Sequence, residues 1–128
     1  MVRQKNILFA EDDMFLRECV SEIILGNFSE VNLEICEDGV SLEKKLRQGP
    51  NGTHLILTDN QMPGPNGSQL ISEYALKEEY KHIPFILYYG GNPEVGKQAV
   101  RDGAFGYLIK PARNEELIQI VKRALKIK

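Results

Sequence analysis

The stretch "LILTDNQMPGPNG", residues 55–67, ends an apolar run with one carboxylate, Asp59, and follows it with prolines and glycines. Neither a helix nor a strand continues through Pro63 to Gly67, because proline lacks the amide donor and glycine favours turns. The apolar run before Asp59 is typical of a short buried strand. The sequence therefore predicts a strand that ends at Asp59 and leaves this acid at the strand's carboxyl end.

The same unit, a short apolar run followed by a segment of helical period, recurs five times along the chain. The predicted strands are residues 6–10, 31–36, 54–58, 84–89 and 106–109. The residues expected at helix ends are Asp13 and Gly26 for the first helix, Asp38 for the second, Pro93 and Gly103 for the fourth and Asn114 for the fifth.

These units predict an α/β fold with one five-stranded parallel sheet, doubly wound and covered by helices on both faces. A parallel connection needs a crossover, and every crossover here has a helical period. The length of 128 residues suits a single domain, residues 1–128. Ligands of such sheets bind at the carboxyl ends of the strands, so candidate functional residues are expected there.

Composition excludes several functional classes. The 16 Lys and Arg against 18 Asp and Glu give a net charge of −2, which indicates neither a nucleic-acid partner nor an anionic membrane surface. No apolar run approaches the roughly 18 residues of a membrane span, and no signal peptide is recognised. Cys19 and Cys36 have no metal-ligand spacing, so we expect free thiols and a cytoplasmic location.

The predicted strand ends carry acids, tyrosines and one lysine. Each residue alone has an ordinary explanation: Asp13 suits a helix cap and Asp59 a turn before Pro-Gly. Gathered at one sheet edge, however, acids repel one another and need a cation, and Mg²⁺ prefers oxygen ligands of this kind. The residues at these ends are Glu11, Asp12 and Asp13, then Asp59, then Tyr88 and Tyr89, and finally Lys110 and Pro111.

Four segments together resemble the receiver domain of two-component response regulators, the CheY-like superfamily. They are "ILFAEDD" (7–13), "LILTDNQMPGPNG" (55–67), "HIPFIL" (82–87) and "GAFGYLIKP" (103–111), and the resemblance extends over essentially the whole chain. It implies a flavodoxin-like fold with strand order 2-1-3-4-5. It also implies a protein that accepts a phosphoryl group from a histidine kinase or phosphotransfer protein and signals through protein contacts.

The resemblance implies a role for each strand-end residue. Such a domain catalyses its own phosphoryl transfer and autodephosphorylation, and it is not a turnover enzyme. The implied roles are phosphoacceptor for Asp59, Mg²⁺ ligands for Glu11, Asp12, Asp59 and the backbone carbonyl of Gln61, phosphoryl-oxygen contact for Lys110, switch aromatic for Tyr107, and a cis bond before Pro111.

One position departs from the family's pattern. A serine or threonine usually ends strand four, whereas Tyr89 stands there when residues are counted from Pro84, and Tyr88 when they are counted back from Lys110. Two hypotheses remain open. The domain is phosphorylated but switches weakly or by another route, or it is a degenerate receiver that docks partners independently of phosphorylation. A further hypothesis is that the Gln61 amide orients the water that removes the phosphoryl group.

Two other functions, nucleotide binding by a P-loop and phosphatase activity, fit the sequence less well. "GNPEVGKQ" (91–98) nearly matches a P-loop, but Gln98 lacks the required hydroxyl and Glu94 adds negative charge. An aspartate-nucleophile phosphatase is disfavoured because Gln61 replaces its second acid. No effector or DNA-binding motif stands before Lys128. We therefore expect either a single-domain regulator that acts through contacts with a protein target, or a fragment of a larger regulator or hybrid kinase whose effector domain is missing from this chain.

Overall fold

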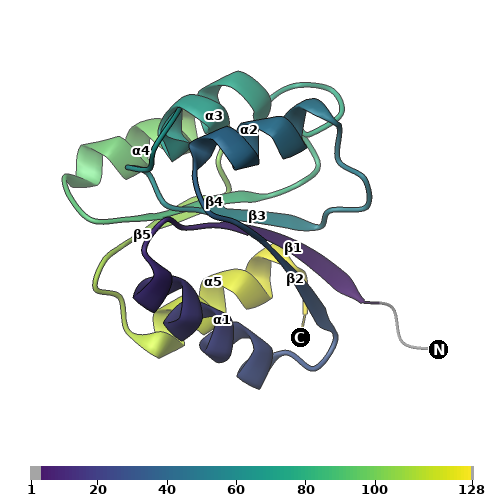
Figure 1. The fold of residues 1–128 in the computed structure, drawn as a ribbon, viewed down its shortest axis with the longest axis vertical. Helices are drawn as coiled ribbons and strands as arrows, with labels where there is room; N and C mark the ends of the chain where they lie inside the picture. Colours follow the sequence, from purple (N-terminus) through teal and green to yellow (C-terminus); the bar gives the residue numbers. More distant parts are fainter. Residues whose placement is uncertain (1–3, 128) are drawn as a thin grey trace.

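The structure, a computed structural model, describes residues 4–127 as strands and helices that alternate along the chain (Figure 1). The strands are β1 (Lys5–Ala10), β2 (Val31–Cys36), β3 (Leu55–Thr58), β4 (Phe85–Tyr89) and β5 (Gly106–Ile109). The helices are α1 (Met14–Asn27), α2 (Gly39–Arg47), α3 (Gly67–Tyr74), α4 (Pro93–Arg101) and α5 (Asn114–Ala124). Each strand boundary lies within one residue of its prediction.

All strand pairs are parallel, and the sheet order is β2-β1-β3-β4-β5, which confirms the predicted fold class. Ala10 pairs with Thr58 across β1 and β3. The next residues, Glu11 and Asp59, therefore leave the sheet side by side. The Asp59 amide still donates to the Ala10 carbonyl at 2.9 Å, which fixes this alignment at the carboxyl edge.

Helices cover both faces of the sheet. Helices α2, α3 and α4 lie on one face and α1 and α5 on the other (Figure 1). Each face has its own apolar core, because successive strand residues point to opposite sides. Along β1, Leu8 and Ala10 belong to the core under α2–α4, whereas Ile7 and Phe9 belong to the core under α1 and α5.

Most predicted helix ends are confirmed. The Asp13 carboxylate caps α1 by accepting from the Leu16 amide at 3.0 Å, and Asp38 caps α2 by accepting from the Ser41 amide at 2.7 Å. Pro93 occupies the first turn of α4. Gly103 follows α4 with a φ of +115°, a left-handed conformation that favours glycine.

Two predicted helix ends are wrong. Helix α1 runs through Gly26 to Asn27, and its cap residue is Phe28, whose amide donates to the Ile24 carbonyl at 3.0 Å. Burial of the Phe28 ring in the core under α1 and α5 favours the longer helix. Asn114 is the first residue of α5 and not its cap, which is Arg113.

None of the helices in residues 4–127 has the length and apolar character that crossing a membrane requires.

Candidate functional site

Three carboxylates meet at the carboxyl edge of the sheet. Glu11 and Asp12 follow β1, Asp59 follows β3, and one carboxylate oxygen from each lies within 4.8 Å of the other two. Glu11 is buried, Asp59 is half-buried and Asp12 is exposed. The sheet register thus gathers the acids that the sequence predicted at strand ends, and the cluster opens to solvent on the Asp12 side.

Lys110, the residue after β5, contacts two of the three acids. Its Nζ lies 2.7 Å from Glu11 Oε1 and 3.4 Å from Asp59 Oδ1. The lysine side chain is 17% exposed, so both ion pairs are sheltered from bulk water. The ammonium therefore bridges two acids that come from different strands.

The cluster holds three acids and one amine, and this excess of negative charge affects the pKa values of Glu11 and Lys110. Burial raises the pKa of Glu11, and the charge of Asp59 acts in the same direction against the hydrogen bond from Lys110. Burial alone lowers the pKa of Lys110, but its hydrogen bond to Glu11 and the Asp59 charge outweigh burial and raise that pKa. Both directions are expected of a cluster with excess negative charge, which favours a further cation.

The donor set fits Mg²⁺. Carboxylate oxygens are its preferred protein ligands, and one oxygen from each of the three acids lies within 4.8 Å of the other two. Asp13 belongs to the cap of α1 instead, and its amide donates to Glu11 Oε2 at 3.2 Å. Gln61 lies exposed in the loop after β3, two residues beyond Asp59.

The loop after β3 orients the Asp59 carboxylate. The Asn60 amide donates to Asp59 Oδ1 at 2.7 Å, and the Asn60 side chain accepts from the Ser68 amide at 2.9 Å. Gly67 approaches so closely that a Cβ there would lie 2.1 Å from the Asp59 carbonyl oxygen. The Pro/Gly break in the sequence thus lets the chain fold back under the acid.

Tyr89, and not Tyr88, ends β4 beside the lysine. Tyr89 pairs with Ile109, and the Lys110 amide donates to the Tyr89 carbonyl at 2.7 Å. The Tyr89 side chain is buried against α4, where its hydroxyl is bonded. The Tyr88 ring is half-buried on the opposite face, and Lys110 Nζ lies 5.4 Å from its centroid, within the range of a cation–π contact.

The two remaining candidates lie on and after β5. The Tyr107 ring is half-buried, with its centroid 6.4 Å from that of Tyr89. The peptide bond between Lys110 and Pro111 is cis.

One contact of the site was not anticipated from the sequence. Arg17 on α1 donates from Nη1 to the Glu11 carbonyl oxygen at 3.0 Å and so braces the acidic turn. A single arginine within an amphipathic helix carries no signal for this role, because exposed arginines commonly occupy the solvated face of a helix.

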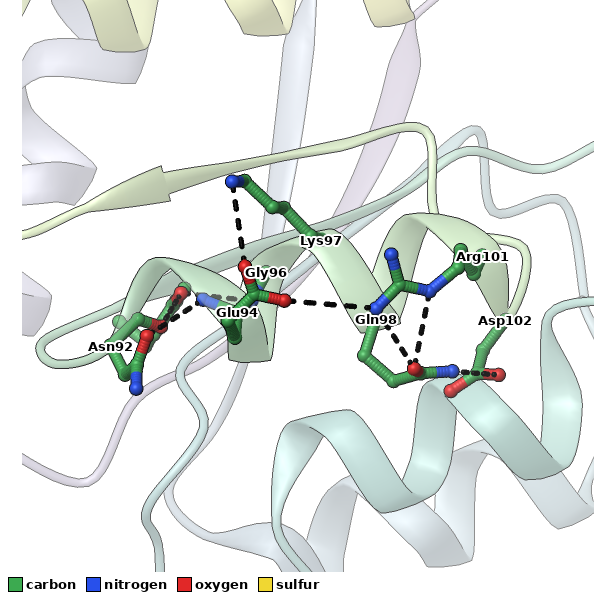
Figure 2. A network of polar contacts seen from close by, with 8 residues as sticks. Asn92, Glu94, Gly96, Lys97, Gln98, Arg101 and Asp102 are labelled. Carbon is green, nitrogen blue, oxygen red and sulfur yellow. Dashed lines mark hydrogen bonds and ion pairs between the residues drawn. The ribbon is translucent and has the colours of Figure 1, made fainter.

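The segment that resembled a P-loop has a structural role. Asn92 caps α4 by accepting from the Glu94 amide at 2.9 Å, and Lys97 pairs with Glu94 at 3.5 Å (Figure 2). Gly96 is buried within the helix. The segment from Pro93 to Gln98 therefore forms the first turns of α4, and only Gly91 and the cap residue Asn92 precede the helix.

The sequence of this chain is similar to those of known proteins. The family model of the response regulator receiver domain matches residues 7–122. Response regulator protein FleR of Pseudomonas aeruginosa is 30% identical over 120 residues, which are 92% of this chain and 24% of FleR. Chemotaxis protein CheY-3 of Vibrio cholerae is 27% identical over 110 residues, which are 85% of this chain and 82% of CheY-3.

Solved structures match the fold. Chemotaxis response regulator CheY4 of Vibrio cholerae gives a TM-score of 0.80 at 24% identity and covers 95% of this chain and 99% of its own. A receiver domain protein from Clostridium thermocellum gives 0.83 at 20% identity and covers 95% and 94%.

The chain spans about a quarter of the length of FleR and of the C4-dicarboxylate transport regulator DctD, two of its curated relatives. The family match nevertheless covers nearly all of residues 4–127, and Glu11, Asp12, Asp59 and Lys110 stand together at one sheet edge. The chain belongs to the response regulator receiver domain family of two-component signalling.

Proposed function

We propose that Asp59 accepts a phosphoryl group in a Mg²⁺-dependent reaction and that the domain signals its state through protein contacts. The observation that carries this proposal is the Lys110 ammonium, 3.4 Å from Asp59 Oδ1 inside a cluster of three carboxylates. Attack of the Asp59 carboxylate on a phosphoryl donor brings negative charges together. A sheltered ammonium and a bound cation beside Asp59 would neutralise that charge.

The reaction forms one bond and breaks another. An Asp59 carboxylate oxygen attacks the phosphorus in line, the bond from phosphorus to the leaving group breaks, and that group departs with the bonding electrons. Water later attacks the acyl phosphate, which releases phosphate and restores the carboxylate. Glu11, Asp12, Asp59 and the Gln61 carbonyl would hold Mg²⁺, which would neutralise charge on the phosphoryl oxygens.

The residues around Asp59 leave one of its carboxylate oxygens free to attack, and Lys110 stabilises the phosphorylated product. Both the Asn60 amide and the Lys110 ammonium contact Asp59 Oδ1, which leaves Oδ2 as the less engaged oxygen. Lys110 is already charged and sheltered, so its interaction with a phosphoryl oxygen needs little reorganisation. The Gln61 amide, exposed in the same loop, is our candidate for orienting the hydrolytic water.

The family implies the partners. We infer that a sensor histidine kinase or a phosphotransfer protein supplies the phosphoryl group in the cytoplasm. We further infer that the signal passes to a protein target or to an effector domain of a longer regulator. FleR and DctD, which are about four times the length of the matched segment, support the second form of output.

The test is intact-protein mass spectrometry after incubation with Mg²⁺ and acetyl phosphate. We expect a mass gain of one phosphoryl group that Asp59→Asn removes and that chelation of Mg²⁺ prevents. Asp13→Asn is the matched control, because Asp13 is a neighbouring acid that caps α1. A chain that gains no mass, or gains it equally with Asn at position 59, contradicts the phosphoacceptor role.

One observation favours a second function, a docking module independent of phosphorylation. The hydroxyl at the end of β4 belongs to Tyr89 and is already bonded within α4. If this function is right, binding to the partner is unchanged by phosphorylation and by Asp59→Asn. Partner affinity measured with the acyl phosphate present and absent therefore discriminates the two functions.

A further inference from the structure

The first turn of α4 is closed differently from those of the other helices. In each of the others, the fourth helical residue donates its amide to the carbonyl of the cap residue, at 2.9 to 3.2 Å. These pairs are Arg17 to Asp13, Leu42 to Asp38, Leu70 to Asn66 and Leu117 to Arg113.

In α4 the corresponding amide belongs to Gly96 and the cap carbonyl to Asn92. The Gly96 amide donates instead to the Tyr89 hydroxyl at 2.8 Å, and the Tyr89 hydroxyl donates to the Asn92 carbonyl. The hydroxyl thus bridges the Gly96 amide and the Asn92 carbonyl, which also accepts from the Val95 amide at 3.1 Å. Tyr89 is only 1% exposed, and the bond from the Gly96 amide to its hydroxyl is buried.

Gly96 also receives the ring of Tyr107. A Cβ at Gly96 would lie 2.3 Å from Tyr107 Cδ2, so the ring packs directly on the helix backbone. Tyr89 comes from β4 and Tyr107 from β5, and their ring centroids are 6.4 Å apart. Two tyrosines from neighbouring strands therefore meet α4 at the same glycine.

The same tyrosine is joined to the carboxylate site through its backbone. The Lys110 amide donates to the Tyr89 carbonyl at 2.7 Å, and the Lys110 ammonium contacts Glu11 and Asp59. Lys110 thus contacts the carboxylates through its ammonium and, through its amide, the residue whose hydroxyl is bonded to the first turn of α4.

We propose that the Tyr89 hydroxyl is a latch that holds the first turn of α4 to the end of β4, and that the state of Asp59 reaches α4 by acting on this latch. The second half of the proposal rests on the proposed function of Asp59, whereas the first half does not. Tyr89 is thus a positioning residue, and its long side chain is what allows a hydroxyl at the end of β4 to reach α4.

The latch has two arrangements with different hydrogen bonds. In the closed arrangement, the one present in the structure, the hydroxyl bridges Gly96 and Asn92. In the open arrangement the Gly96 amide bonds directly to the Asn92 carbonyl, as the other helices do, and the hydroxyl is released toward other acceptors. A ligand or modification shifts such an equilibrium only if it favours one arrangement. The coupling requires that the phosphoryl group at Asp59, with its added charge and acceptor oxygens, favours one arrangement over the other.

The first experiment tests the closed latch without metal or phosphodonor. Amide hydrogen exchange at Gly96 is measured by NMR in the wild type, Tyr89→Phe and Tyr80→Phe. Tyr80→Phe is the matched control, because it also removes a buried hydroxyl bonded to a helix carbonyl, that of Leu46 at 2.7 Å. We expect Tyr89→Phe to speed Gly96 exchange on the order of tenfold, and Tyr80→Phe to change it by less than about twofold.

A wild-type measurement supports the same test if Tyr89→Phe does not fold. A hydroxyl bonded on both sides and closed to water exchanges slowly, so its proton should give a resonance with a nuclear Overhauser contact to the Gly96 amide. Unchanged Gly96 exchange in a folded Tyr89→Phe, or the absence of that contact in the wild type, overturns the latch.

The second experiment tests the coupling on protein whose acyl phosphate is verified by mass. We expect phosphorylation to change Gly96 exchange by about fivefold or more in the wild type and by less than about twofold in Tyr89→Phe. An equal change in both proteins overturns the coupling and leaves the proposed function intact. If no mass gain occurs at Asp59, the proposed function and the coupling both fail, and the first experiment still decides the latch.

Discussion

Lys110 lies closer to Glu11 than to Asp59: its Nζ is 2.7 Å from Glu11 Oε1 and 3.4 Å from Asp59 Oδ1. The lysine thus neutralises part of the negative charge of the carboxylate cluster. Under the proposed function, the amine and Mg²⁺ would compete for the same acids in the resting domain, and both would neutralise the transferred group in phosphoryl transfer.

This competition gives opposite effects for one substitution. We expect Lys110→Met to tighten Mg²⁺ binding by about tenfold, because it removes a sheltered positive charge beside the ligands. The same change should slow phosphorylation of Asp59 on the order of a hundredfold, because the transition state loses a preorganised cation. Calorimetry and mass spectrometry measure the two effects. Lys97→Met, at an exposed lysine of α4, is the control. Weaker Mg²⁺ binding in Lys110→Met would contradict the competition.

Two glycines should respond oppositely to alanine. A Cβ at Gly67 would lie 2.1 Å from the Asp59 carbonyl oxygen, so Gly67→Ala forces backbone apart and should lower the free energy of unfolding by about 1–3 kcal/mol. A Cβ at Gly26, inside α1, meets nothing within 4 Å, so Gly26→Ala should raise that free energy by about 0.5–1 kcal/mol. Urea unfolding measures both. A neutral Gly67→Ala would show that the loop after β3 adapts freely.

Gly96 and Tyr107 should be energetically coupled. Gly96→Ala places a methyl group 2.3 Å from the Tyr107 ring and should cost about 1–3 kcal/mol of stability. Tyr107→Ala removes the ring, so in the double variant the added methyl group has room. We expect the double variant to be less destabilised than the sum of the single changes by about 1 kcal/mol or more. Strict additivity in urea unfolding would mean that the ring does not rest on the glycine.

Tyr80 should make stability fall at high pH. Burial, with smaller contributions from Tyr74 and Glu79, raises the pKa of Tyr80 to about 12, against an ordinary value of 10.0. The folded state therefore holds this proton more tightly than the unfolded state between these values. Its contribution to stability is complete below pH 10 and is lost as the pH rises toward 12.

Tyr80→Phe tests this dependence. At neutral pH we expect a loss of about 1 kcal/mol, because the hydroxyl no longer donates to the Leu46 carbonyl. Between pH 10 and 12 the difference in unfolding free energy between wild type and Tyr80→Phe should shrink, since only the wild type loses this contribution. A constant difference across that range would show that the hydroxyl keeps its ordinary pKa.

Cys36 should be unreactive in the folded domain. Burial raises the pKa of its thiol to about 11, the Glu34 charge adds to this, and the residue is 2% exposed. Alkylation proceeds through the thiolate, so at pH 8 we expect modification of Cys36 only after unfolding. Peptide mapping after iodoacetamide treatment, with and without denaturant, measures this. Rapid labelling of the native protein at Cys36 would contradict its burial.

The sequence alone predicted the fold well, because period and punctuation report the local backbone. Apolar runs and helical spacing located every strand within one residue, and proline, glycine and aspartate marked most of the turns between elements. The two errors, Gly26 and Asn114, are helix ends. Gly26 failed because the burial of Phe28 outweighed a local stop signal.

The candidate site was predicted as a set of residues and not as a geometry. Parallel strands place their carboxyl ends at one edge, so Glu11, Asp59 and Lys110 were expected together. Which acid the lysine prefers depends on the register between strands and on burial, and neither is a local property. The contact of Arg17 with the Glu11 carbonyl was missed for the same reason.

Tyr88 and Tyr89 show most clearly what the sequence determines and what only the tertiary structure decides. By itself the sequence determined that a large aromatic residue ends strand four, and it left two alignments open. The tertiary structure decided that this residue is Tyr89 and that its hydroxyl stands between Gly96 and Asn92. A residue's own spacing fixes the strand it occupies, but the partner of its hydroxyl is fixed by where a separate helix packs, and only the folded chain brings the two together.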